Sequence, residues 1–347
     1  MYTFSKRLKI ISILLFVVGA IGWGTSYLSS HGLTIEDVKI LLAEENSHHG
    51  GEVSHGADTT ETSHHEVKTD NEAHVAMIHS THDSEVHTED IRESDDHGTD
   101  AHAEHVLHQM HNRPYAALYV AAFFFFMISL GVLAFYAIQY AAQAGWSPVL
   151  FRVMEGITGY LLPGSIIFFL ILVAAGMHWN HLFIWMDEAV VAKDHLLQGK
   201  VGYLNVPFFL IRAAFFLIVW NLYRYFSRKN SLAQDESADN SFFKKNFNIS
   251  AAFLVFFIVS ESIMSWDWIM SVDPHWYSTL FGWYVFASFF VSGITAIALI
   301  TLYLKSKGYL EKVNTSHIHD LAKFMFGISI FWTYLWFSQF MLIWYSN

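Results

Sequence analysis

The chain has 347 residues, of which 53% are hydrophobic and 17% aromatic, while only 15% are charged. This composition is typical of an integral membrane protein. The absence of cysteine excludes disulfides, thiolate ligands for iron–sulfur clusters, c-type haem attachment and thiol catalysis on this polypeptide. The formal net charge of -11 gives no sign of a nucleic-acid partner.

Seven apolar runs are each long enough to cross the roughly 30 Å hydrocarbon core of a bilayer. We therefore expect an all-α integral membrane protein with seven transmembrane helices, surrounded by lipid. The first run, within residues 1–30, follows a basic start and also fits a signal peptide, but no obvious cleavage site follows it, so an uncleaved helix is favoured. The runs are Ile10–Leu28, Tyr115–Tyr140, Leu161–Met177, Val206–Phe226, Ile249–Met270, Thr279–Leu304 and Phe324–Tyr345.

Lys and Arg gather in the segments that lie inside if the N-terminus is cytoplasmic. The positive-inside rule therefore predicts a cytoplasmic N-terminus.

Residues 31–113 hold most of the 21 histidines, mixed with acidic and hydroxyl residues and almost no aromatic ones. Such a segment cannot bury enough apolar area to offset its ordering entropy, so we expect a disordered or loosely structured outer loop. Weak metal binding by the imidazoles is an alternative, but we predict no defined metal site. The following sequence, HNRP, predicts that the second span begins near Pro114.

Two segments near the membrane surface carry further candidates. Glu155 lies at the inner end of the third span. It could admit protons, although a charge at headgroup level is the favoured interpretation. The outer loop 176–205 contains His178 and Asp187 beside tryptophans, which fits a short interfacial helix that docks a partner. Nothing in the loop fixes a full set of zinc ligands.

The fourth and fifth spans contain ionisable residues where hydrocarbon is expected, which makes them functional candidates. By the helical rise, Arg212 and Glu261 lie at similar depth, so we expect them to form a buried pair, either structural or part of a proton route. Asp267 falls on another face, one turn from the surface, where it should be more easily hydrated. The inner loop 227–248 between these spans is polar and expected to be flexible.

The corner after the fifth span reads SVDPHWYS and is expected outside the membrane. Trp266, Trp268, Trp276 and His275 could line a quinol headgroup pocket, with Asp273 or Asp267 taking a proton. Asp273, His275, Trp276 and Tyr277 could instead dock a partner. The favoured interpretation of the aromatic residues is an interfacial belt. No residue is assigned a catalytic role with certainty.

The sequences HNRPYAAL, YAAQAGW, VGYLNVPFFLIR, YLWFSQFMLIWY and, above all, MSWDWIMSVDPHWYS are similar to those of ActF-type membrane subunits of alternative complex III. This bacterial quinol:cytochrome c or quinol:oxidase oxidoreductase has membrane subunits of the polysulfide-reductase (NrfD-like) superfamily. The similarity covers roughly residues 109–347, and the motif at residues 265–277 is long and specific.

The resemblance implies an antiparallel four-helix bundle at residues 114–270 and the start of a second bundle at 271–347. Such subunits usually continue for about three further helices, so either the second bundle is incomplete here or the sequence is not the whole gene product. The resemblance also implies a multi-pass protein of the bacterial inner membrane that binds no cofactor itself. It would sit beside a quinol-binding sister subunit, a multihaem cytochrome c and an iron–sulfur subunit, with a terminal oxidase as a further partner.

In that setting the chain would be an accessory subunit, a scaffold with menaquinol or another quinol bound nearby. Candidates for a proton path are Glu261, Asp267, Arg212 and Glu155. The alternative function is a secondary transporter or channel with Arg212 and Glu261 in its pathway. Inverted repeats would favour a transporter, and no convincing repeat is visible.

Overall fold

The computed structural model describes residues 6–49 and 90–346, and these contain helices and no strand. Seven segments of the described chain are long and apolar enough to span a membrane, which confirms the expected all-α membrane architecture. They include α1 (Lys6–His31), α3 (Asp90–Ala141), the series from η1 (Ser147–Leu150) through α4 (Phe151–Ile157) and η2 (Thr158–Tyr160) to α5 (Leu161–Gly176), α8 (Val206–Glu236), α9 (Ser241–Trp268), α10 (Phe281–Ser306) and α11 (Thr315–Ser346).

The chain divides into two compact units, one of residues 17–114 and the other of residues 1–16 and 115–347. In the unit of residues 17–114, α2 (Ile35–His49) begins with a capping box. The Thr34 amide donates to the Asp37 carboxylate at 2.9 Å, and the Asp37 amide donates back to the Thr34 hydroxyl at 3.4 Å. In the same unit, the Trp23 indole donates a hydrogen bond to the Pro114 carbonyl at 3.0 Å.

This unit corrects two expectations for residues 31–113. Residues 35–49 and 90–113 are helical rather than loosely structured, while residues 50–89 lie outside the described part. Pro114 lies inside α3 and not at its start. The described part of α3 starts at Asp90, and Glu, Ala, Leu, Gln and Met between Asp90 and Pro114 are good helix formers, so local propensity continues the helix into polar sequence.

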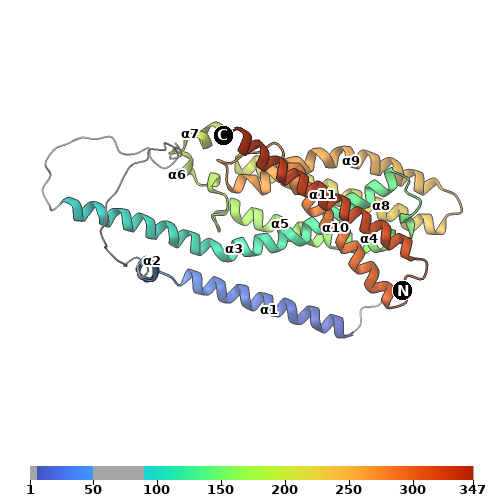
Figure 1. Ribbon diagram of the computed structural model, residues 1–347, viewed down its shortest axis with the longest axis horizontal. Coiled ribbons are helices and arrows are strands. Elements are labelled where there is room, and N and C mark those ends of the chain that lie inside the picture. Colours follow the sequence, from blue (N-terminus) through green and yellow to red (C-terminus); the bar gives the residue numbers. More distant parts are fainter. Residues whose placement is uncertain (1–5, 50–89, 347) are drawn as a thin grey trace, which may run out of the picture. The chain divides into compact units, whose positions relative to one another are not determined.

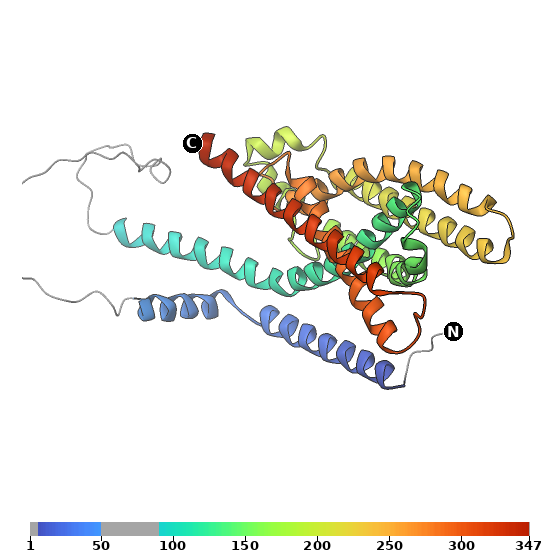
Figure 2. The ribbon, with the colours of Figure 1, turned by 45° about the vertical axis from the view of Figure 1, so that its right-hand side comes forward.

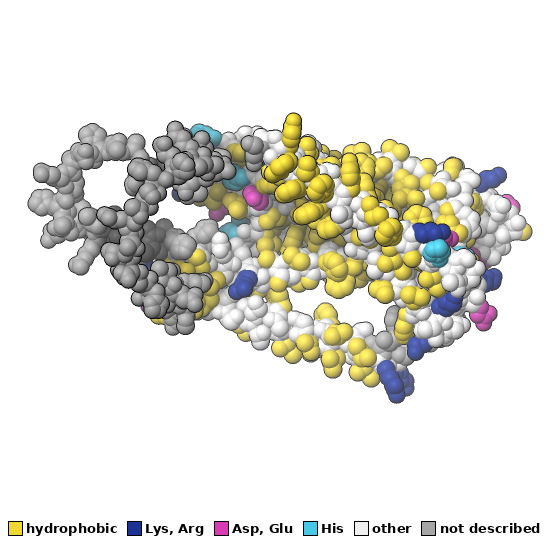
Figure 3. Space-filling model, viewed as in Figure 1, with side chains coloured by type: hydrophobic (Ala, Val, Ile, Leu, Met, Phe, Trp, Pro, Cys, Tyr) yellow, Lys and Arg dark blue, Asp and Glu magenta, His cyan; other side chains and the backbone are white. Residues whose placement is uncertain are grey.

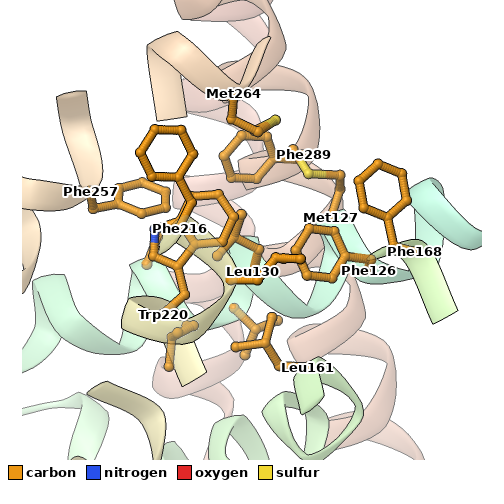
Figure 4. Close-up of a cluster of buried hydrophobic side chains, with 14 of the residues drawn as sticks. Phe126, Met127, Leu130, Leu161, Phe168, Phe216, Trp220, Phe257, Met264 and Phe289 are labelled. Carbon is orange, nitrogen blue, oxygen red and sulfur yellow. The ribbon is translucent and has the colours of Figure 1, made fainter. Parts of the chain in front are cut away.

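The core of the unit of residues 1–16 and 115–347 is mainly aromatic. Phe126 of α3, Phe168 of α5, Trp220 of α8 and Phe257 of α9 are all 2% exposed or less. Their rings converge on Leu130 and Met264 from different helices (Figure 4). Because lipid tails are as apolar as these side chains, close packing rather than escape from water holds the helices together.

Helices α3 and α10 approach each other most closely at two glycines. A Cβ atom on Gly131 would lie 2.5 Å from the Phe289 carbonyl oxygen, and one on Gly293 would lie 2.8 Å from the Val132 amide nitrogen. Neither position can hold a larger side chain without moving a backbone. Small residues such as these permit the close helix packing on which membrane proteins depend.

Helices α8 and α9 form a hairpin, as do α10 and α11 (Figures 1 and 2). The connection from α8 to α9 is only residues 237–240, so the predicted flexible inner loop 227–248 is wrong. Both helices extend beyond the apolar runs into this segment. Asp239 closes the turn by accepting hydrogen bonds from the hydroxyls of Ser237 and Ser241 at 2.7 and 2.8 Å.

Helix α11 buries little of its surface. Leu321 and Leu335 are its only buried residues, and its outer surface is covered by hydrophobic side chains (Figure 3). Such a surface in a membrane span is suited to lipid.

Candidate functional site: buried charges between the helices

Arg212 of α8 binds Asp267 of α9 in a two-point ion pair. The guanidinium Nε lies 2.7 Å from Asp267 Oδ2, and Nη2 lies 3.0 Å from Oδ1. Arg212 is 8% exposed and Asp267 is fully buried. The predicted pair of Arg212 with Glu261 is therefore wrong, and so is the expectation that Asp267 is hydrated. The bidentate contact satisfies both charges. A charge left unpaired inside a membrane would be costly.

The short connection before α8 fixes the Arg212 guanidinium. Its carbon atom lies 4.1 Å from the ring centre of Tyr203 and 4.0 Å from that of Phe208, so two aromatic rings flank the charge. Nη1 donates to the Tyr203 carbonyl at 3.2 Å. Burial and the charge of Asp267 raise the pKa of Tyr203. Tyr203 therefore stays a neutral phenol beside the ion pair.

Glu261 has no such partner. The side chain is 4% exposed on α9, and its Oε1 makes no hydrogen bond. Within the described residues no cation pairs with it. A carboxyl group in this position can hold or pass on a proton without breaking an ion pair, which distinguishes it from Asp267.

Glu155 of α4 belongs to a polar cluster at the opposite end of the α8–α9 hairpin. Its carboxylate accepts from the Tyr136 hydroxyl at 3.0 Å and from Arg152 at 2.5 Å. Arg152 also bonds to the Asp235 carboxylate and, at 3.3 Å, to the Ser231 carbonyl. With 6% of its surface exposed, Glu155 is buried by the protein, and its position at headgroup level stays a prediction. Whether it admits protons stays a prediction.

The corner at residues 273–277 is joined to the loop before α8. His275 Nε2 lies 2.6 Å from Asp194 Oδ2, and the Lys200 ammonium donates to the Pro274 carbonyl at 2.5 Å. Asp194 also caps α7 (His195–Lys200) by accepting from two backbone amides. Burial raises the pKa of Asp194, but the bonds from the Leu196 amide and His275 outweigh this effect and hold it below the ordinary value.

The other predicted residues of the outer side remain separate. Asp273 is exposed, with its carboxylate 4.0 Å from His275 Nδ1. Asp187 caps the short helix α6 (Glu188–Val191). His178 is exposed, with a φ of 59°, a left-handed conformation that is uncommon outside glycine. The described residues contain no cluster of His, Cys, Asp and Glu that could hold a metal ion.

Three cavities lie near the corner. The largest of them, about 620 Å³, lies among α3, α9 and α10, and Trp268 lines it with an indole N–H that has no partner. A second, about 340 Å³, is lined by Trp266, Trp276 and Tyr277, and a third, about 210 Å³, is lined by Trp276. The predicted quinol-pocket residues are thus divided among these cavities, and Asp273 and His275 line none of the three.

Tyr136, Arg152 and Asp235 were not among the candidates drawn from the sequence. The spacing of Arg152 and Glu155 by three residues on one short helix was a usable signal for their pairing. Asp235 could not be linked to them because it was assigned to a flexible loop.

Comparisons with known proteins assign no family. No family model matches the chain, and no curated protein matches it.

Proposed function

We propose that this chain is a non-haem membrane subunit of a bacterial quinol-oxidising respiratory complex of the alternative complex III type. It acts as a scaffold in the inner membrane, with the N-terminus cytoplasmic and the loop 176–205 and corner 273–277 facing partner subunits outside. The haem c groups and iron–sulfur clusters belong to those partners, and the quinol is oxidised by the sister membrane subunit. The sequence motif at residues 265–277 supports this assignment.

The observation that carries the functional part of the proposal is Glu261, a buried carboxyl group inside a span with no cation beside it. Intramembrane carboxyl groups are costly and typically serve ion or proton pathways. In the proposed role, Glu261 takes up and releases a proton during quinol turnover, while the Arg212–Asp267 pair holds α8 and α9 in place. Glu155 is the candidate for proton exchange at the cytoplasmic side.

The transporter alternative is less well supported. Its pathway was expected to contain Arg212 and Glu261 together, and the guanidinium is instead bound to Asp267 at two points. Moving substrate past Arg212 would require breaking that pair.

The proposal is tested by isolating the chain from its native membrane in mild detergent and recording co-purifying subunits and the visible spectrum. We expect haem c absorbance and an iron–sulfur subunit. A chain that purifies alone and colourless would refute the assignment.

The role of Glu261 is tested separately in the assembled complex. Glu261→Gln should leave assembly intact and reduce quinol oxidation, since the amide cannot exchange protons. Glu311→Gln, at an exposed position, is the matched control. Turnover of the Glu261 variant equal to that of the control would exclude the proton role while leaving the subunit assignment untouched.

A further inference from the structure

A groove with a cavity volume of about 490 Å³ lies between α5 and α8. Helix α5 contributes an apolar stripe at helical spacing, Leu162, Ile166 and Leu170. Helix α8 contributes the matching stripe of Ala214, Ile218 and Leu222. Exposed fractions of 61% for Leu170 and 58% for Ile218 show that the groove opens outward rather than into the core.

One end of the groove is polar. Arg224 lines it, and the Nε of its guanidinium is buried and makes no hydrogen bond. Asn221, one turn earlier on α8, donates to the Ser165 hydroxyl at 2.9 Å and leaves its own Oδ1 buried and without a partner. A donor cation and an acceptor thus remain unsatisfied at the same end of an otherwise apolar groove, and buried polar atoms usually have partners.

Among the described residues no carboxylate forms an ion pair with Arg224. Glu155 interacts with its charge at longer range, and that carboxylate is already bound by Tyr136 and Arg152. Arg228, one turn farther along α8, adds a second exposed positive charge. The guanidinium itself lies over η2, where Nη2 would be 3.7 Å from a Cβ atom on Gly159. The polar end therefore carries net positive charge and suits an anion.

The groove's length indicates what the anion is attached to. From Ala214 to Arg224 is about 15 Å at the helical rise, half of the roughly 30 Å hydrocarbon core. Arg224 is also about 27 Å from the start of α8, which places it at the membrane boundary. An apolar channel that spans one leaflet and ends in an arginine at headgroup level has the dimensions of a lipid molecule.

We propose that this groove is a binding site for an anionic glycerophospholipid, with the phosphate on Arg224, a headgroup or glycerol donor on Asn221 Oδ1 and an acyl chain along the α5 and α8 stripes. A partner helix would fill the apolar part but would leave Arg224 and Asn221 without partners. The site is independent of the proposed respiratory role. It would make this chain's packing dependent on the lipid composition of its leaflet.

The test is native mass spectrometry of the detergent-solubilised full-length chain, titrated with dioleoyl phosphatidylglycerol and, separately, dioleoyl phosphatidylcholine. We expect tighter binding of the anionic lipid. Arg224→Gln should weaken its binding about tenfold, the order of one charge-assisted hydrogen bond. Lys229→Gln removes the same charge from an exposed position outside the groove and should change binding by less than about twofold. The proposal would be overturned if the two variants bound phosphatidylglycerol equally well, or if the parent chain bound the two lipids equally well.

A second variant addresses the apolar part without touching the charge. Ala214→Phe fills the groove, whereas Ala251→Phe adds the same bulk at an exposed position on α9 that does not line it. Only the first should lower affinity for phosphatidylglycerol. A photo-crosslinking amino acid at Ile218 in the native membrane should capture lipid. Capture of a polypeptide there would show that a partner helix occupies the groove and would refute the lipid site.

Discussion

Arg212 and Asp267 lie 55 residues apart in the sequence and join α8 to α9 through two hydrogen bonds, 2.7 and 3.0 Å long, in a fully buried contact. Removing one partner leaves the other charge uncompensated. We expect Asp267→Asn to lower the free energy of unfolding by about 3–5 kcal/mol. Unfolding in mixed micelles with a denaturing detergent measures this change.

The double variant Arg212→Met/Asp267→Leu distinguishes the energy of the interaction between the two charges from the effect of losing either side chain alone. Because it removes both charges, it should be less destabilised than Asp267→Asn, and the thermodynamic cycle should show strong coupling. Additive effects would mean that the two side chains do not interact.

The contact between Gly131 and Gly293 predicts a steric effect. Gly131→Ala places a Cβ atom 2.5 Å from the Phe289 carbonyl oxygen, so α3 and α10 must separate. We expect a loss of about 1–3 kcal/mol in unfolding free energy. Gly327→Ala on α11 is the matched control, since nothing lies within 4 Å of its new atom. The control should stabilise the helix by about 0.5–1 kcal/mol. A neutral result at Gly131 would contradict the close approach.

The loop 176–205 should loosen in acid when the Asp194 carboxylate becomes protonated. Because its pKa is held below the ordinary value of 3.8, folding favours the carboxylate. Its stabilising effect is complete above the unfolded pKa and is lost as the pH falls through the folded pKa, so α7 should loosen below about pH 4. Since the chain has no cysteine, a single cysteine replacing Lys193 can carry an environment-sensitive fluorophore.

Two variants check this assignment. Asp194→Asn should give the acid-like fluorescence already at neutral pH, because the uncharged amide binds His275 and the helix amides more weakly. Asp187→Asn removes a similar charge from the neighbouring cap, which does not contact His275, and should titrate like the parent chain. Identical titrations for all three proteins would assign the transition to another group.

Glu155 depends on Tyr136 for one of its two hydrogen-bonded neighbours. Tyr136→Phe should therefore lower the unfolding free energy by about 1–3 kcal/mol, the value of a hydrogen bond to a charged group. Tyr225→Phe, at a position that is 59% exposed, loses a hydroxyl without such a bond and serves as the control. If both variants unfold alike, the Tyr136 hydroxyl does not stabilise Glu155.

The seven spans could be predicted because hydropathy and length alone determine them, but the pairing of charges could not. The depth estimate compared Cα atoms and placed Glu261 level with Arg212. The charge of a long arginine side chain, however, lies several bonds away from its Cα atom. The guanidinium extends toward the surface and the Tyr203 carbonyl. Asp267 lies six residues, about 9 Å, closer to that surface than Glu261 along α9.

The two predicted loops were wrong for a related reason. Polarity was treated as a sign of irregular structure in 227–248 and in the part of 31–113 next to the second span. Both segments contain good helix formers, and each adjoins an apolar helix that has already overcome the cost of nucleation. A helix that begins in lipid therefore continues into water until a turn such as that at Asp239 ends it.

The separation of Arg212 from Asp267 in the sequence also bears on how the chain is made. Synthesis at about 5–20 residues per second delivers Asp267 roughly 3–11 seconds after Arg212. An arginine in an isolated span is costly to insert, up to about 2.5–3.5 kcal/mol at the span's centre and less toward its end, where Arg212 lies. A chain that enters the bilayer as it is synthesised would meet that cost before its partner exists. The α8–α9 hairpin is therefore expected to leave the insertion machinery as a unit, with α8 retained there until α9 arrives.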